Sequence, residues 1–235
     1  MVGRQTGLSK MKILCVSDHI DPLVYSPSIK QRFADVELVL SAGDLPLSYY
    51  DFIMSTLNKP LLFVFGNHNL RYMPLYSGHI DAFGRGRLEG QGIDAFLPTG
   101  ATYIGSRARR EKSLLLAGLG GSFWYNGEEN QYREFQVFLR ILKLLPRLLY
   151  NRLRFGRCLD ILLTHAPPFG IHDQSDPCHR GFKSFLWFMH VFRPKYLVHG
   201  HTHLYSASAA RISRYEQTTV VNAYDHVIIE VEDLR

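Results

Sequence analysis

The sequence predicts a mixed α/β fold, and three features of the chain support this prediction. Short apolar runs at residues 12–18, 36–44 and 59–68 are bounded by turn-forming residues, as buried parallel strands are. The stretches between them, 19–35 and 46–58, are long enough for crossover helices. The last third of the chain then returns to short strand-like runs. Strands that alternate with helices, followed by a strand-rich end, indicate an α/β or α+β architecture.

Composition excludes several classes of protein. Of the 235 residues, 46% are hydrophobic and 20% are charged, which is typical of globular domains and argues against disorder. No apolar run reaches the ~20 residues that a membrane span requires, and residues 1–10 lack the apolar core of a signal peptide. Three cysteines without a CxxC spacing favour a reduced compartment. We therefore expect a cytoplasmic protein with a flexible tail at 1–10 and a single domain over 11–235.

The middle and the end of the chain also divide into regular elements. A glycine-rich turn is expected at 84–92. Residues 181–192 have the pattern of a helix that precedes a strand. The further strand-like runs are 93–98, 101–106, 113–121, 157–165, 194–201, 209–213, 218–223 and 226–231.

Residues 132–157 have the pattern of an amphipathic helix, in which Pro146 should cause a kink or an end. The apolar face is formed by Val137, Phe138, Ile141, Leu142 and Leu145. The basic side is formed by Arg133, Arg140, Lys143 and Arg147. Two interpretations fit this segment: a helix packed on the sheet with a solvated basic side, or an element that meets an acidic membrane surface at the periphery.

Polar side chains of the kinds that bind metal ions follow five separate strands of the predicted sheets. These are Asp18, Gly43-Asp44, Gly66-Asn67-His68, Thr164-His165 and Gly200-His201-Thr202-His203. Ligand sites in open α/β sheets lie beyond the carboxyl ends of the strands, so we expect these side chains to converge. One such pair alone is usually a turn or a surface loop, but the same layout of a strand followed by a ligand is repeated five times, and this repetition indicates a shared site.

Two divalent cations held close together repel each other and need an anion between them. Asp44 is the natural bridging carboxylate, and neutral amide and imidazole groups can then complete the coordination. Glycines before Asp44, Asn67 and His201 allow a sharp turn and a close approach of the backbone. Metal binding also explains how His201 and His203 can lie together, because a bound ion favours neutral imidazole.

At these residues the sequence resembles the calcineurin-like metallophosphoesterase family, whose pattern is D-x-H, G-D, G-N-H, an H-x-P-type histidine and G-H-x-H. The resemblance runs from Asp18 to His203, and the stretch from His165 onward is most similar to small, single-domain phosphodiesterase-like members. It implies a two-sheet β-sandwich flanked by helices on both sides. It also implies a phosphoester hydrolase that uses a metal-activated hydroxide at a dinuclear site.

The resemblance also implies a role for each matching residue. Asp18 and His203 would bind the first metal ion, and Asp44 would bridge both ions. The second ion would be bound by Asn67, His165 and His201. His68 would face the substrate, where it could stabilise the transferred charge or protonate the leaving oxygen.

One position departs from the family pattern. The histidine expected two residues after Asp18 is replaced by Ile20, with His19 and Asp21 on either side as candidate replacement ligands. We therefore expect the first metal site to be weak and the second to be firmer. The oxygen and nitrogen ligand set suits Mn²⁺, Fe and Zn²⁺, and the resemblance favours manganese.

The net charge and the family resemblance indicate the class of substrate. The formal charge of +6 suits an anionic partner, and the expected substrate is a nucleotide, a cyclic nucleotide or a lipid-linked phosphate, with phosphodiesters favoured. His172, His179 and Arg180 lie in a loop that should overhang the site and are candidate substrate contacts. Two alternatives stay open: a scaffold that has lost catalysis, and a hydrolase of lipid or nucleotide-lipid pyrophosphates at a membrane surface. No specific protein partner is indicated.

Overall fold

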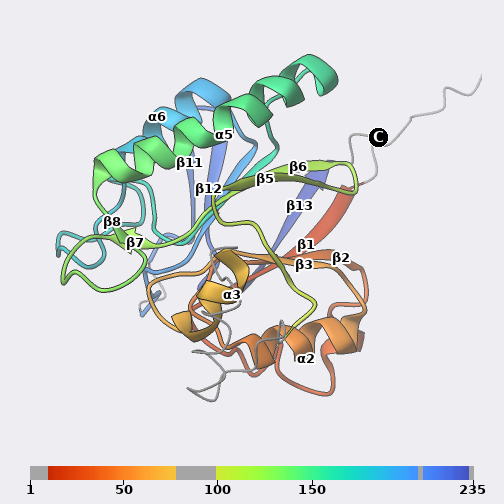
Figure 1. Cartoon of the computed structure of the whole chain (residues 1–235). Coiled ribbons are helices and arrows are strands. Elements are labelled where there is room, and N and C mark those ends of the chain that lie inside the picture. The colour runs from red at the N-terminus through yellow and green to blue at the C-terminus, as the bar shows by residue number, and fades with distance from the viewer. Residues whose placement is uncertain (1–9, 78–98, 206–208, 233–235) are drawn as a thin grey trace, which may run out of the picture.

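Two β-sheets pack face to face and helices cover the outer face of each, as the computed structural model of the chain shows (Figure 1). The structure describes residues 10–77, 99–205 and 209–232. The expected two-sheet sandwich flanked by helices on both sides is therefore confirmed. The turn expected at 84–92 and the strand expected at 93–98 lie outside the described residues, as do residues 1–9 of the expected tail.

The first sheet contains the three apolar runs from the start of the chain. Its strands β1, β2, β3 and β4 are parallel neighbours, and β13 is antiparallel to β1 at the edge. In spatial order they are β13 (Asp225–Glu232), β1 (Lys10–Ser17), β2 (Val36–Ser41), β3 (Leu61–Phe63) and β4 (Thr102–Tyr103). Against its outer face pack α1 (Ile29–Arg32), α2 (Leu47–Leu57), the 3₁₀ turn η1 (Leu70–Tyr72) and α3 (Met73–Ser77).

The second sheet is built from the rest of the chain. Four central strands are parallel, and β11 and β5 are antiparallel edges. In spatial order they are β11 (Ile212–Tyr215), β12 (Thr218–Asn222), β10 (Tyr196–His199), β9 (Ile161–Thr164), β6 (Leu114–Leu119) and β5 (Arg107–Glu111). Its outer face is covered by α5 (Glu134–Phe155) and α6 (Lys183–Phe192). A two-stranded parallel pair, β7 (Ser122–Phe123) and β8 (Gln131–Tyr132), lies at one end.

Alternation along the strands distributes apolar side chains among three layers of core. In β1, Ile13 and Cys15 face the second sheet, whereas Leu14 and Val16 face the helices below the first sheet. All four are fully buried, and each contributes about 1.5–3 kcal/mol when removed from water, less for the smaller cysteine. The charged sequence of β5 gave no strand signal, because this edge strand is largely exposed.

The helix α5 differs from the expectation in three ways. Of the two expected effects of Pro146, a kink or an end, the end does not occur, because the helix continues through this residue; Pro146 is exposed, so water can satisfy the Leu142 carbonyl that the proline cannot serve. Leu142 is itself exposed, and its expected place on the buried face is wrong. Arg140, expected on the solvated side, instead turns inward and donates hydrogen bonds to Ser106 Oγ at 2.9 Å and to the Gly120 carbonyl at 2.7 Å.

Parallel strands of both sheets deliver their carboxyl ends to one rim of the sandwich. Asp18 follows β1, Asp44 follows β2, His165 follows β9 and His201 follows β10. Both sheets therefore contribute to a site at this rim. Among the described helices, none is long and apolar enough to cross a bilayer.

Candidate metal centre

A cavity of about 290 Å³ opens at the rim where the strands end. Its walls are formed by Asp18, Asp44, His68, Asn69, Cys178, His179, His201 and His203. Asn67 and His165 lie just behind this wall and are buried. The structure thus brings together side chains that are far apart in the sequence.

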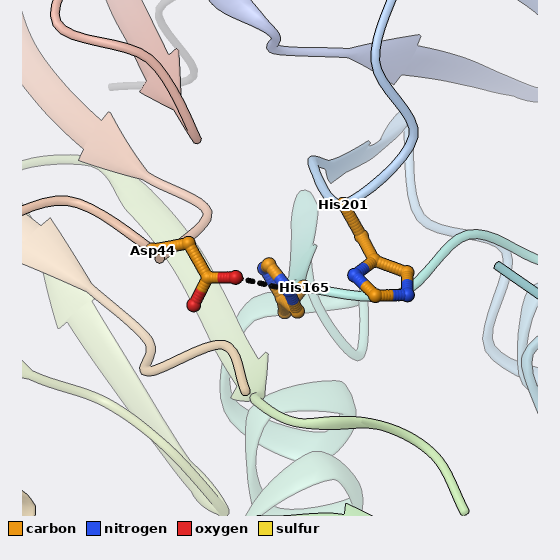
Figure 2. Close-up of side chains that lie close together, drawn as sticks. All are labelled: Asp44, His165 and His201. Carbon is orange, nitrogen blue, oxygen red and sulfur yellow. Dashed lines mark ion pairs between the residues drawn. The ribbon is translucent and has the colours of Figure 1, made fainter. Parts of the chain in front are cut away.

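Asp44, His165 and His201 form the inner part of the site (Figure 2). One donor atom of each lies within 4.8 Å of the donor atoms of the other two, which is close enough for one ion to bind all three after small adjustments. Asp44 Oδ2 is 3.2 Å from His165 Nε2. The ring centroids of the two histidines are 4.8 Å apart.

Hydrogen bonds fix which ring nitrogen of each histidine is available. His165 Nδ1 donates to the Ala42 carbonyl at 2.8 Å, so Nε2 is the nitrogen that faces Asp44 and Asn67 and that an ion would bind in place of a proton. His201 does the opposite, because its Nε2 donates to the Cys178 carbonyl at 2.7 Å and leaves Nδ1 free. Figure 2 shows one ring nitrogen of His201 turned toward His165 and the other turned away. Carbonyl partners of this kind orient metal-binding histidines in many proteins.

Asn67 is the fourth side chain beside Asp44, His165 and His201, and its orientation is set by Tyr125. The Asn67 side chain donates from Nδ2 to the Tyr125 hydroxyl at 3.2 Å, so that its Oδ1 faces His165 Nε2 at 3.0 Å. Tyr125 and Cys178 were missed by the sequence analysis. The signal available for Tyr125 was its place shortly after the strand-like run 113–121, which ends at the same rim.

The electrostatics of the site reflect the close packing of these groups. Burial favours the neutral form of His165, but the adjacent carboxylate of Asp44 outweighs it and raises the pKa of His165 to about 9. Burial acts against the charge of Asp44 as well, yet His165 lowers the pKa of Asp44 to about 2. Burial and the neighbouring His165 lower the pKa of His201 to about 3. The ionised carboxylate of Asp44 and the neutral ring of His201 suit a divalent cation, which would take the place of the proton on His165.

The backbone is unusual at three of the expected ligands. Asp18, Asp44 and His201 have φ values of 63°, 58° and 67°, a left-handed conformation that costs a non-glycine residue roughly 1–3 kcal/mol. Gly66 is required by a close approach, because a Cβ atom there would lie 2.5 Å from Asp44 Cγ. At Gly200 it would lie 2.8 Å from Ser17 Cβ. Strain and close approach at one place are typical of functional sites.

Asp18 and His203 form the outer part of the cavity wall. Asp18 Oδ2 accepts hydrogen bonds from the His201 backbone N–H at 2.9 Å and from the Ser17 hydroxyl. Burial raises the pKa of Asp18 despite these bonds. His203 packs on the ring of Tyr224 with 4.8 Å between centroids. This half of the cavity offers fewer donor atoms than the half around His165.

The candidate replacement ligands beside Asp18 are engaged elsewhere. His19 Nδ1 is 2.7 Å from Asp225 Oδ1. Asp21 Oδ2 is 2.5 Å from His226 Nδ1, and its other oxygen accepts a hydrogen bond from a backbone N–H in its own turn. Ile20 is 38% exposed. In this conformation the structure does not bring His19 or Asp21 to the cavity.

His68 lies at the mouth of the cavity. Its backbone N–H donates to Asp44 Oδ1 at 2.8 Å, and its side chain lines the cavity wall. The next residue, Asn69, donates from its side chain to the Asp44 carbonyl at 3.1 Å. These two hydrogen bonds hold residues 66–69 against the loop that contains Asp44. They therefore place His68 next to the Asp44 carboxylate, the proposed ligand of the ions.

The three candidate substrate contacts in the loop after His165 have different positions. His179 lines the cavity, with its ring centroid 5.3 Å from that of His201. Arg180 is not part of the cavity wall, and its guanidinium lies over the rings of Phe123 and Phe169 at 5.0 and 5.7 Å. His172 lines a neighbouring pocket of about 390 Å³ that shares His203 with the first.

A directed chain of hydrogen bonds connects this loop to the end of β10. His199 Nδ1 donates to the Gly200 carbonyl at 2.9 Å, so its Nε2 must accept from His172 Nδ1 at 2.9 Å. His172 Nε2 then accepts from the Ser213 hydroxyl at 2.8 Å. The buried His199 is thereby satisfied as a neutral ring, and burial lowers its pKa to about 3. We therefore interpret His199 as a structural residue that supports the loop containing His172.

Comparison with known proteins extends the picture. The family model described as calcineurin-like phosphoesterase matches residues 11–205. The protein TT1561 of Thermus thermophilus is a similar solved structure, with a TM-score of 0.60 and 12% identity over 95% of this chain and 99% of its own. Another has a TM-score of 0.61 and 13% identity over 96% of this chain and 100% of its own. At these identities the likeness shows the fold alone. A search of curated proteins finds no match.

Proposed function

The chain belongs to the calcineurin-like phosphoesterase family, and from this premise we propose that it hydrolyses phosphodiesters at a dinuclear metal site. Family membership makes it a metal-dependent phosphoester hydrolase. Beyond family membership, we propose which residues bind the metal, that two ions are bound, and that diesters are preferred over monoesters. The proposed ligands are Asp18 and His203 for one ion, Asn67, His165 and His201 for the other, and Asp44 for both.

One observation carries the proposal: donor atoms of Asp44, His165 and His201 converge within 4.8 Å, and each imidazole turns toward this place the ring nitrogen that does not contact a backbone carbonyl. Carboxylate and imidazole groups are costly to bury unless they are paired, and one cation would pair with all three. Asn67 Oδ1 faces the same point. The donor set of carboxylate, amide and imidazole fits Mn²⁺, Fe or Zn²⁺, and manganese is the proposed ion.

The protein groups have separate tasks in the proposed reaction. When bound, the ions supply positive charge for the phosphoryl oxygens and lower the pKa of water enough to make it a nucleophile near neutral pH. Asp44 provides the negative charge that lets two cations lie together. His68, at the mouth of the cavity, donates a proton to the leaving oxygen, and His179, which also lines the cavity, contacts the substrate.

Hydrolysis of an aryl phosphodiester in the presence of Mn²⁺ tests the proposal. We expect turnover that is lost with chelator, and a decrease of at least ~100-fold in Asp44→Asn and His201→Ala. Asp35→Asn and His190→Ala are matched controls, because both residues are exposed and pair with Lys12 and Glu216 away from the cavity. Turnover that survives chelation or both site variants would contradict the proposal. A parallel assay with an aryl phosphomonoester measures the preference for diesters.

The number of ions is tested separately. Since His19 and Asp21 are engaged with Asp225 and His226, the proposed site around Asp18 should bind its ion more weakly than the site around His165. A calorimetric titration with Mn²⁺ should show two classes of site, and Asp18→Asn should remove the weaker class. A single class unaffected by Asp18→Asn would contradict the dinuclear proposal. Substoichiometric metal with no turnover would instead support the scaffold alternative.

A further inference from the structure

The helix α5 carries a second apolar surface, separate from the one that packs on the sheet. Its buried face consists of Val137, Ile141, Leu144 and Leu148. On the opposite side, a row of apolar residues follows at alternating spacings of four and three, and every member is exposed. This row, the α5 seam, consists of Phe135, Leu139, Leu142, Pro146, Leu149 and Leu153. Phe135 is 68% and Leu153 is 89% exposed, so no part of the described chain covers the seam.

Positive charge flanks the α5 seam. From Phe135 to Phe155 the helix contains no Asp or Glu. Apart from the inward-facing Arg140, its cations are Lys143, Arg147, Arg152 and Arg154, and all four are exposed. Within the described part of the chain none of these four forms a salt bridge. The outer side of α5 therefore combines apolar surface with uncompensated positive charge.

The neighbouring helix α6 widens this surface. Trp187 and Val191 are 38% and 45% exposed, and the Trp187 ring packs against Phe138 with 5.2 Å between centroids. Figure 1 shows α5 and α6 side by side on the outer face of the second sheet. Tyr150, beside the seam, is 50% exposed. Tryptophan and tyrosine are the side chains enriched where protein meets the boundary of a lipid layer.

We infer that the α5 seam and the adjoining residues of α6 dock on an anionic lipid surface. An amphipathic helix with leucine and aromatic residues beside lysine and arginine lies in the plane of a membrane interface. The apolar side chains enter the boundary between head groups and acyl chains, and the cations neutralise acidic head groups. This inference does not depend on the proposed phosphodiesterase activity.

A second copy of the chain fits this surface less well, although spacings of four and three are also those of a coiled coil. The positions flanking such a seam on α5 include Lys143 and Arg152 but no acidic residue. Two copies, in either orientation, would therefore place like charges together. The seam also lacks the polar residue that sets register with a partner helix, whereas a lipid surface requires no register.

Docking would place the catalytic rim near the lipid. The strand β8 leads directly into the start of α5, and Tyr125 in the turn before β8 contacts Asn67 of the proposed metal centre. At the same end, Arg133 lies over the ring of Trp124 at 4.9 Å, and Trp124 is 43% exposed. The end of α5 where the seam starts is thus connected to the proposed metal centre through the β7–β8 segment and Tyr125.

Vesicle flotation with the full chain tests the inference. We expect the protein to float with vesicles of phosphatidylcholine and phosphatidylglycerol at about 2:1, and to stay in solution with phosphatidylcholine alone. The triple variant Leu139→Gln, Leu149→Gln, Leu153→Gln should lower the vesicle affinity at least ~10-fold. The double variant Lys143→Gln, Arg147→Gln should also weaken it and reduce its sensitivity to salt.

The matched apolar control is Ile212→Gln with Ile228→Gln, since these residues are 58% and 39% exposed on other elements. This control should float as the wild type does. The urea midpoint of the triple variant should match that of the wild type, which shows that the fold is intact whether or not the protein hydrolyses phosphodiesters. Absence of flotation, or equal flotation of the triple variant, would overturn the inference. Self-association that the triple variant abolishes, without vesicle binding, would assign the surface to a second copy.

Discussion

The substitution Gly66→Ala gives a sharp test of how closely the metal centre is built. A Cβ atom at this position would lie 2.5 Å from Asp44 Cγ, whereas ordinary contacts begin at 3.4 Å. The Asp44 carboxyl group must therefore move by at least about 0.9 Å, since its Oδ1 lies even closer than Cγ, while metal–ligand distances tolerate only ~0.2 Å. The same Cβ atom would also collide with the His165 ring. One methyl group thus displaces two proposed ligands.

The expected effect is large for metal binding and moderate for folding. Loss of an outer partner of a metal ligand already costs 10–100-fold in affinity, so displacing Asp44 and His165 should cost at least ~100-fold in Mn²⁺ affinity. Overpacking of this kind lowers the free energy of unfolding by about 1–3 kcal/mol, which leaves a stable domain folded. Calorimetric Mn²⁺ titration measures the first effect, and urea unfolding of the metal-free protein measures the second.

Gly100→Ala is the matched control, because a Cβ atom there meets nothing closer than 3.4 Å, at Met54 Cε. It should bind Mn²⁺ as the wild type does. If Gly66→Ala binds Mn²⁺ within threefold of the wild type and remains folded, the assignment of Asp44 as a ligand is refuted. If Gly66→Ala does not fold, Asp44→Asn in the same titration decides the question.

Three further predictions concern pH, an outer partner of the site and the two faces of α5. Because the pKa of His165 is raised to about 9 without metal, an ion must displace its proton, so Mn²⁺ affinity should rise by up to ~10-fold per pH unit up to about pH 9; a titration series from pH 6 to 9 that showed no change would contradict this. Tyr125→Phe removes the acceptor that orients Asn67 and should weaken Mn²⁺ binding about 10-fold with an unchanged urea midpoint. Leu144→Ala, on the buried face of α5, should lower the free energy of unfolding by about 2–5 kcal/mol, whereas Leu153→Ala should change it by less than ~0.5 kcal/mol in the same urea experiment.

Much of the fold follows from simple patterns in the sequence. Short apolar runs that end in polar residues correspond to β1, β2, β3, β9 and β10, because a strand buried on both faces has little choice of composition. The amphipathic pattern of residues 132–157 correctly predicts α5. It does not resolve which apolar residues face the sheet, because this helix has apolar side chains on two sides and only tertiary packing selects between them.

The positions of side chains that directly follow strands could be predicted from the sequence. Features that depend on backbone conformation or on main-chain hydrogen bonds could not. Asp44 and His165 could be placed at one rim from strand ends alone. The left-handed backbone at Asp18 and His201 cannot be read from the residue types, because Asp and His adopt it more often than most residues but still only at a few positions. The Cys178 carbonyl that orients His201 is a main-chain group that any residue would provide, so a motif search cannot find it.

The proposed ligands come from both layers of the sandwich, and this has a thermodynamic consequence. Asp44 follows a strand of one sheet, whereas His165 and His201 follow strands of the other. A cation shared by them would oppose separation of the layers at this edge, so its binding energy would also be conformational stability. At a free concentration 100 times the dissociation constant, this adds about 2.7 kcal/mol to the free energy of unfolding. The lifetime of the protein in a cell would then depend on its supply of metal, because a chain deprived of the cation is easier to unfold and to degrade.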